Sequence, residues 1–286
     1  MRRLLPFVAL GIGVFLVMGL TCNGTPTITL VEASATVVDG ADIVMLTVTA
    51  TDPDGDPLTF TWTAPSGTFD TTTGDTVYWT PPTVTATETV TVTVTAEDGN
   101  GGSAVGTVDI DVHPYVVIGD KDQVPHWPFN GSAADYTRAQ YLYHDSEITH
   151  NDTIFRVSLM PYTPTPNWGA FDDFEMYLCP TARMDLQDTF ALNYGTNTPT
   201  LVYSNTHLTY GNEDEDRWFW FDLDTPFAYD GGDLLLEMFW EGDSDVTVRT
   251  CGWNTQYYRE NYTHVKGREI EPPNMLCLHL KLTFLN

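Results

Sequence analysis

The sequence predicts an all-β protein in which an Ig-like β-sandwich is followed by a larger jelly-roll-like β-sandwich, with an N-terminal signal segment before both. Three observations predict this fold class. Apolar residues alternate with threonine at a period of two, turn-forming residues recur between the alternating runs, and no helical periodicity occurs from residue 26 to 113. Period-two alternation is typical of strands with one buried and one solvent-exposed face. At 286 residues, the chain is long enough for two domains with separate cores.

Residues 1–21 have the pattern of an export signal. Arg2 and Arg3 precede an apolar run from Leu4 to Leu20, and Cys22 follows almost immediately. This segment resembles a bacterial lipoprotein signal, which implies that Cys22 is lipidated and tethers the mature chain to a membrane. Ordinary secretion and an uncleaved single-helix anchor are the alternatives. All three interpretations place the rest of the chain outside the cytoplasm.

The charge of the chain is strongly negative. The formal net charge is -27, and residues 22–113 contain no Lys or Arg. Such a surface repels phosphate backbones, so we exclude nucleic acid as a partner. The same field favours divalent cations, although acidity also serves solubility alone.

The first module is expected over residues 22–113. Its alternating runs are centred on four groups of apolar residues: Val44, Leu46 and Val48; Leu58, Phe60 and Trp62; Val90, Val92 and Val94; Val108, Ile110 and Val112. Turn chemistry such as Asp98-Gly99-Asn100-Gly101-Gly102 separates them. A sandwich of seven strands fits this length and spacing.

Three carboxylates stand close together in the turn between the first and second of these runs, at Asp52, Asp54 and Asp56. The phrases TATDPDGDPLTFTW, TVYWTPP and TVTVTVTAEDGNGGSAVGTVDIDV resemble bacterial Ig-like modules of the PKD and cadherin-like group. In cadherin-like relatives such loops bind calcium, which implies Asp52, Asp54, Asp56 and Asp98 as metal ligands. PKD-type relatives keep the loops without calcium, and a solvated turn remains the alternative. Calcium prefers six to eight oxygen ligands, of which three alternate carboxylates supply a good part.

The second module is expected over residues 114–286, where the threonine alternation ends and most aromatic residues begin. Strands are predicted over 154–160, 174–178, 200–203, 218–223, 233–240, 246–251 and 276–284. The segment is similar to a β-sandwich module appended to secreted bacterial surface proteins and peptidases. The residues that carry this likeness are Pro128, Phe129, Gln140, Tyr143, Glu147, Ile148, Trp218, Phe221, Leu223, Pro226, Phe227, Tyr229 and Gly231. The resemblance implies an accessory role and no catalytic residues.

Aromatic residues are the main candidates for ligand contact. Trp253, Tyr257 and Tyr258 stand in a turn-rich stretch, and exposed rings stack on the faces of sugars. Trp218 and Trp220 share a strand face, and we interpret both as core residues. Among Cys179, Cys251 and Cys277, the pairing Cys179–Cys251 is one of three choices.

No nucleophile elbow, P-loop, dinucleotide fingerprint or zinc-protease helix occurs in the sequence. The pattern predicts a non-enzymatic, membrane-tethered surface protein that binds an extracellular glycan or surface protein, with calcium as its cofactor. Two alternatives remain: an accessory module of an extracellular hydrolase, and a purely structural component of the cell envelope.

Overall fold

The computed structural model describes residues 22–119, 124–130, 137–160, 168–211, 218–241, 247–254, 260–263, 276–278 and 280–285. The all-β fold class predicted from the sequence is confirmed for these residues. Their helical content is the four-residue helix α1 (Phe190–Asn193) and the 3-10 turn η1 (Asp145–Glu147). Among them, no helix combines the length and apolar character needed to cross a bilayer.

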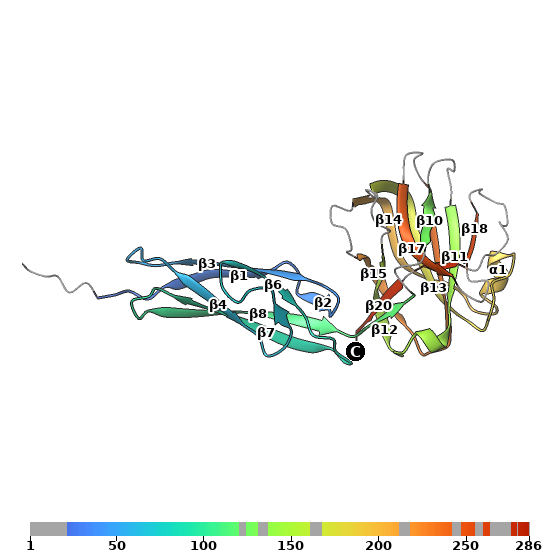
Figure 1. Cartoon of the computed structure of the whole chain (residues 1–286). Coiled ribbons are helices and arrows are strands. Elements are labelled where there is room, and N and C mark those ends of the chain that lie inside the picture. The colour runs from blue at the N-terminus through green and yellow to red at the C-terminus, as the bar shows by residue number, and fades with distance from the viewer. Residues whose placement is uncertain are drawn as a thin grey trace, which may run out of the picture.

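The first module is a sandwich of two four-stranded sheets (Figure 1). One sheet has the order β1-β3-β6-β5 and the other β2-β8-β7-β4. The strands are β1 (Thr27–Ala33), β2 (Val37–Asp39), β3 (Val44–Thr51), β4 (Thr59–Thr63), β5 (Thr68–Phe69), β6 (Thr76–Thr80), β7 (Glu88–Glu97) and β8 (Ser103–His113). The count is eight rather than the expected seven. The short strands β2 and β5 lack a run long enough to show a period of two.

The core of this module follows from the alternation. The valines of β7 are fully buried while the threonines between them face outward or are half-buried. Trp62 and Trp79 fill the centre with no exposed surface. Each indole Nε1 donates to a backbone carbonyl, that of Gly74 at 3.0 Å and that of Ser66 at 3.2 Å. Both large side chains are therefore buried without an unpaired donor.

The second module is a larger antiparallel sandwich. Its sheets have the orders β14-β13-β16-β11-β18, β15-β12-β20-β9 and β10-β17-β19. The strands are β9 (Tyr115–Ile118), β10 (Val124–Asn130), β11 (Thr137–Tyr143), β12 (Thr153–Leu159), β13 (Trp168–Thr181), β14 (Thr200–Gly211), β15 (Phe219–Ala228), β16 (Asp233–Glu241), β17 (Thr247–Asn254), β18 (Glu260–Thr263), β19 (Leu276–Leu278) and β20 (Leu280–Phe284).

Aromatic rings fill the space between the five-stranded and four-stranded sheets. Phe174 stacks on Phe221 with ring centroids 5.4 Å apart and an interplanar angle of 5°, and Trp240 lies 6.2 Å from the same ring. The final strand was expected to run through residues 276–284. The structure has two strands there, β19 in the three-stranded sheet and β20 in the four-stranded sheet, because the chain passes from one sheet to the other.

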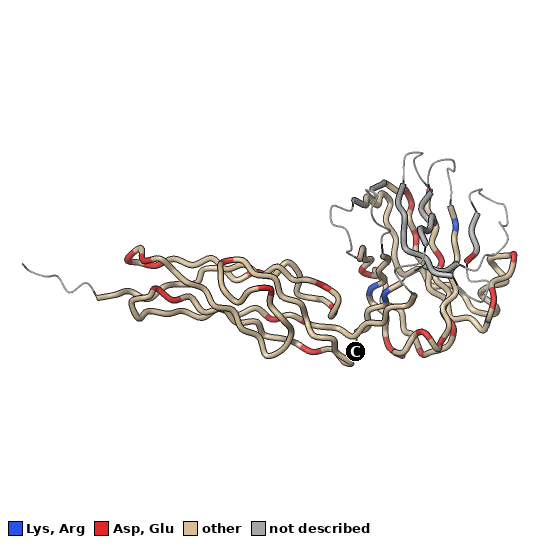
Figure 2. Tube along the Cα trace, viewed as in Figure 1, with Lys and Arg blue, Asp and Glu red and all other residues tan. Residues whose placement is uncertain are grey.

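Pro114 alone separates β8 from β9, so the two modules are joined without a linker. Figure 1 shows the second module at the end of the elongated first module, with the C-terminus between them. Figure 2 shows Lys and Arg positions beside this junction and acidic positions along the first module.

A buried charge cluster holds the junction together. Lys281 Nζ lies 2.9 Å from both carboxylate oxygens of Asp39, and Thr283 Oγ1 donates to Asp39 Oδ2 at 3.0 Å. Asp42 adds two longer ion pairs, with its Oδ1 3.5 Å from Lys281 Nζ and its Oδ2 3.6 Å from Arg156 Nη1. Lys281 and Asp39 are almost completely buried, so the pair stabilises only the docked arrangement.

Polar and ring contacts extend this junction. His113 Nδ1 lies 3.1 Å from the carbonyl oxygen of Phe284 and 2.9 Å from Thr87 Oγ1, which also donates to Leu285 O. The His113 ring meets Phe155 edge-on at 4.7 Å. Burial lowers the pKa of His113, so the neutral imidazole is favoured at this interface.

Candidate functional site

The aspartate loop lies between β3 and β4, at the end of the first module away from the second. One carboxylate oxygen from each of Asp52, Asp54 and Asp56 lies within 4.8 Å of the others. Asp52 Oδ1 accepts the backbone N–H groups of Asp54 at 2.8 Å and Asp56 at 3.2 Å. Gly55 has a φ of 78°, a conformation that glycine adopts without strain. The loop therefore holds its three carboxylates together rather than spreading them into solvent.

Residues 23–24 and the β7–β8 turn close around this loop. Gly24 N donates to Asp54 Oδ2 at 2.6 Å, and Asn100 Nδ2 donates to Asp56 Oδ2 at 2.8 Å. Asn23 Nδ2 donates to Asp98 at 2.8 Å. Three chain segments are thus connected at this end of the sandwich, directly beside Cys22.

Asp98 is not part of the three-carboxylate cluster. Its Oδ1 accepts the backbone N–H groups of Asn100 at 2.7 Å and Gly102 at 2.9 Å, and its Oδ2 accepts from Asn23. These hydrogen bonds, that from Asn23 foremost, lower the pKa of Asp98. The structure assigns this residue to holding the turn and the N-terminal segment in place.

The chemistry of the aspartate loop fits a hard divalent cation. Asp52 Oδ2 is buried from solvent and has no hydrogen-bond partner. A buried carboxylate oxygen without a partner is costly unless a cation or donor compensates it. Two further carboxylates within 4.8 Å supply more oxygen ligands of the kind that calcium prefers. Asp52, Asp54 and Asp56 would hold such an ion.

The predicted aromatic contact residues fall largely outside the described residues. Trp253 is in β17, opposite Cys277 of β19. Tyr257 and Tyr258 lie outside the described residues. Their role in ligand binding stays a prediction.

For Trp220, the interpretation as a core residue is wrong. Its side chain is 55% exposed, and the guanidinium of Arg156 lies 5.6 Å from the ring centroid. Trp218 is half-buried, with Lys281 Nζ 5.5 Å from its ring. The period of two correctly puts Trp218 and Trp220 on one face of the strand. Their rings lie near Lys281 and Arg156 at the junction rather than in the apolar core.

A buried polar network lies on the five-stranded sheet beneath α1, and no local sequence pattern predicts it. Glu237 accepts from Arg138 Nε at 2.8 Å, from Gln140 Nε2 at 2.5 Å and from the hydroxyl of Tyr194. Asn193 Nδ2 donates to Gln140 Oε1 at 2.8 Å. Burial and the Glu237 carboxylate raise the pKa of Tyr194. The three donors and Asn193 connect the α1 segment to the sheet, so the network holds this segment in place.

Several of the residues that carry the likeness of the second module to the appended β-sandwich module, here called the motif positions, also make structural contacts. Glu147 accepts the backbone N–H of His144 at 2.8 Å and so closes the η1 turn. The hydroxyl of Tyr229 donates to the carbonyl of Gly232, and Gly231 has a φ of 96°. Gln140 belongs to the Glu237 network. These motif positions form turns and networks that support the sandwich.

A cavity of about 630 Å³ lies over β13, β14 and β16. Three carboxylates line it, from Asp173, Glu175 and Glu241. Glu175 accepts from the hydroxyl of Tyr177 at 2.7 Å, and burial together with this bond raises the pKa of Tyr177 to about 12. The negative lining disfavours anionic ligands.

The pairing Cys179–Cys251 is wrong, because Cys179 is a free, buried thiol. Cys179 lies on β13 and packs with Leu142, Leu186 and Leu235, whereas Cys251 lies on β17 in the three-stranded sheet. Burial raises the pKa of Cys179 to about 11, which keeps it protonated. Cys22 is a free, exposed thiol, as a modification site requires.

Comparison with known proteins supports the assignment of the first module. Residues 23–111 match the family model described as bacterial Ig domain. No curated protein matches the chain.

Two solved structures were found at low similarity. A carbohydrate-binding module of the beta-sandwich superfamily is 13% identical, covering 80% of this chain and 96% of its own, with a TM-score of 0.27. A SusE-like protein is 12% identical, covering 89% of this chain and 96% of its own, with a TM-score of 0.19. TM-scores of this size do not establish a shared topology.

Proposed function

We propose that this chain is a non-enzymatic protein of the bacterial cell surface, tethered through Cys22, that acts by binding an extracellular glycan or surface protein. The observation that carries the proposal is the placement of the two ends of the first module. Cys22 and the aspartate loop lie at one end, and the second module docks through the buried Lys281–Asp39 pair at the other. With a tether at one end and the second module held firmly at the other, the first module acts as a spacer that presents the second module away from the membrane.

In this proposal, calcium binds to the aspartate loop as the cofactor of the protein. The buried, unpartnered Asp52 Oδ2 and the two neighbouring carboxylates support a site of the cadherin-like kind. The loop accepts hydrogen bonds from Gly24 and Asn100, and Asn23 donates to Asp98 of the neighbouring turn. A cation bound there offsets the repulsion among the three carboxylates and stiffens the segment that connects the tether to the sandwich.

Ligand contact is assigned to aromatic residues of the second module, Trp253, Tyr257 and Tyr258. Trp220 supports an aromatic contact on the described surface, since its ring is 55% exposed and lies near the Arg156 guanidinium. Because the Arg156 guanidinium already restricts the Trp220 ring, stacking of a sugar on this ring costs little further side-chain conformational entropy.

A glycan and surface-protein array tests this proposal. The full chain is applied with 2 mM calcium or with EGTA, beside the Trp253→Ala and Trp220→Ala variants. Selective retention of the wild-type chain that weakens in one of the tryptophan variants supports the proposal. Absence of any selective retention, with and without calcium, contradicts it.

A further inference from the structure

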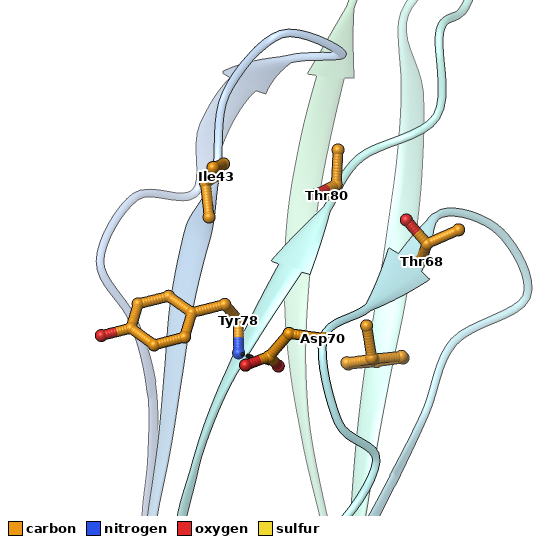
Figure 3. Close-up of a pocket in the computed structure, with 6 residues that line it drawn as sticks. Ile43, Thr68, Asp70, Tyr78 and Thr80 are labelled. Carbon is orange, nitrogen blue, oxygen red and sulfur yellow. Dashed lines mark hydrogen bonds between the residues drawn. The ribbon is translucent and has the colours of Figure 1, made fainter. Parts of the chain in front are cut away.

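The outer face of the β1-β3-β6-β5 sheet carries a hollow of about 440 Å³. We call it the Tyr78 groove. It is lined by six residues, from β5, the position directly after β5, β6 and the segment before β3: Ile43, Thr68, Phe69, Asp70, Tyr78 and Thr80. Figure 3 shows the ring of Tyr78 below Ile43 and pointing away from Asp70 and Thr68, which lie on the other side of β6, with Thr80 further along that strand.

One wall of the Tyr78 groove is apolar and open to solvent. Tyr78 is 43% exposed and Ile43 is 53% exposed. Met45, which pairs with Tyr78 across β3 and β6, is 40% exposed. An aromatic ring flanked by exposed aliphatic side chains offers a flat surface for C–H groups.

The opposite wall presents a carboxylate in a fixed orientation. Asp70 Oδ1 accepts the backbone N–H groups of Thr71 at 2.6 Å and Tyr78 at 2.8 Å. Within the described residues, the other oxygen of Asp70 accepts no hydrogen bond and is free to accept one from a ligand. Thr68 and Thr80 pair across β5 and β6, and both are exposed, so their hydroxyls stand side by side on the same face.

The polarity of the Tyr78 groove limits the class of ligand. Residues 22–113 contain no Lys or Arg, and an anionic ligand would meet only negative charge. A single carboxylate beside hydroxyls and a ring is a poor match for a multiply charged cation, which needs several carboxylates. A sugar ring satisfies both walls, because its C–H face stacks on the aromatic ring and its hydroxyls donate to the carboxylate.

We propose that the Tyr78 groove binds one ring of a neutral saccharide, stacked on Tyr78 and held by hydroxyl donation to Asp70 Oδ2. The groove lies on the Ig-like module, so its occupancy does not depend on any ligand of the second module. The module would then contact a glycan along its length as well as project its partner domain.

The test uses the full chain on an array of neutral oligosaccharides of glucose, galactose, mannose and N-acetylglucosamine, with uronic-acid and sialylated glycans beside them. Affinities for bound glycans are then measured by titration. Tyr78→Ala removes the ring and Tyr78→Phe keeps it. Asp70→Asn retains the oxygen that accepts the two backbone N–H groups, so it removes the free acceptor while keeping the turn. Trp220→Ala is the control for the second module.

We expect binding of at least one neutral glycan, weakened at least tenfold by both Tyr78→Ala and Asp70→Asn and changed less than twofold by Tyr78→Phe. Asp70→Asn answers the question by itself if Tyr78→Ala fails to fold. Absence of neutral-glycan binding overturns the proposal. Binding that survives Asp70→Asn, or binding lost only in Trp220→Ala, also overturns it, and the latter leaves the role of the second module intact.

Discussion

Lys281 places its ammonium 2.9 Å from both carboxylate oxygens of Asp39, although the two residues are 242 positions apart in the sequence. The side chains are 1% and 0% exposed. A buried ion pair of this kind offers no large net gain over apolar residues, but the loss of one partner leaves an uncompensated charge. The two modules therefore depend on each other for the stability of their junction.

Replacement of Lys281 by Met is expected to destabilise the chain by about 3–5 kcal/mol, because Asp39 is left as an unpaired buried carboxylate. Urea unfolding measures the loss. The double variant Lys281→Met with Asp39→Asn should recover much of it. Asp222→Asn, which removes the 62%-exposed partner of Arg156, should cost about 1 kcal/mol or less. Equal losses of unfolding free energy for Lys281→Met and Asp222→Asn would be evidence against a special role of the buried Lys281–Asp39 pair.

The Asp42 carboxyl gives the junction a pH dependence of unusual sign. Burial and the Asp39 charge raise its pKa in the folded chain, against the lowering by Lys281 and Arg156. A raised folded-state pKa means that the stability from protonated Asp42 is complete below the unfolded-state pKa and is lost as pH rises through the folded-state pKa. Asp42→Asn should flatten the stability profile in that window, as followed by urea unfolding from pH 4 to 7. An unchanged slope in the variant would show that Asp42 is not the group responsible.

Calcium should stabilise the first module. At a calcium concentration about a hundred times Kd, binding adds about 2.7 kcal/mol, which raises Tm by several degrees. Asp52→Asn removes the buried unpartnered oxygen and keeps the acceptor of the loop hydrogen bonds, so its Tm should not respond to calcium. Asp75→Asn, a change at an exposed carboxylate outside the cluster, should respond like the wild type. A calcium shift that persists in Asp52→Asn rules out the proposed ligand set.

Cys22→Ala should release the chain from the membrane fraction of the producing bacterium. The reason is that lipidation requires the thiol, and Cys22 is exposed. Fractionation and the intact mass of the mature chain report the result. Cys179→Ala is the control, since that thiol is buried. Membrane association that persists unchanged in Cys22→Ala would favour an uncleaved anchor.

The sequence predicted the features that depend on local pattern. The alternation through β7 and the inward Trp62 were readable because period-two spacing fixes which side chains share a face. The gathering of Asp52, Asp54 and Asp56 followed from their spacing in a turn. Such inferences need only neighbours along the chain.

The sequence did not show which element covers the second face of a strand. Lys281 and Thr283 alternate with leucines in β20 and would face solvent in an isolated module, yet both are buried against Asp39. The free state of Cys179 was missed for the same reason, because the sequence does not show that the two strands belong to different sheets. Contacts between distant elements decide these cases.

The most direct test of the central claim is to recover a ligand retained by the wild-type chain after prolonged incubation with excess protein and to determine its mass. A protein that acts only by binding should show saturable, reversible binding and leave the mass of its ligand unchanged. Progressive conversion of the ligand to products, in proportion to protein concentration and time, would contradict the account and identify the chain as an enzyme.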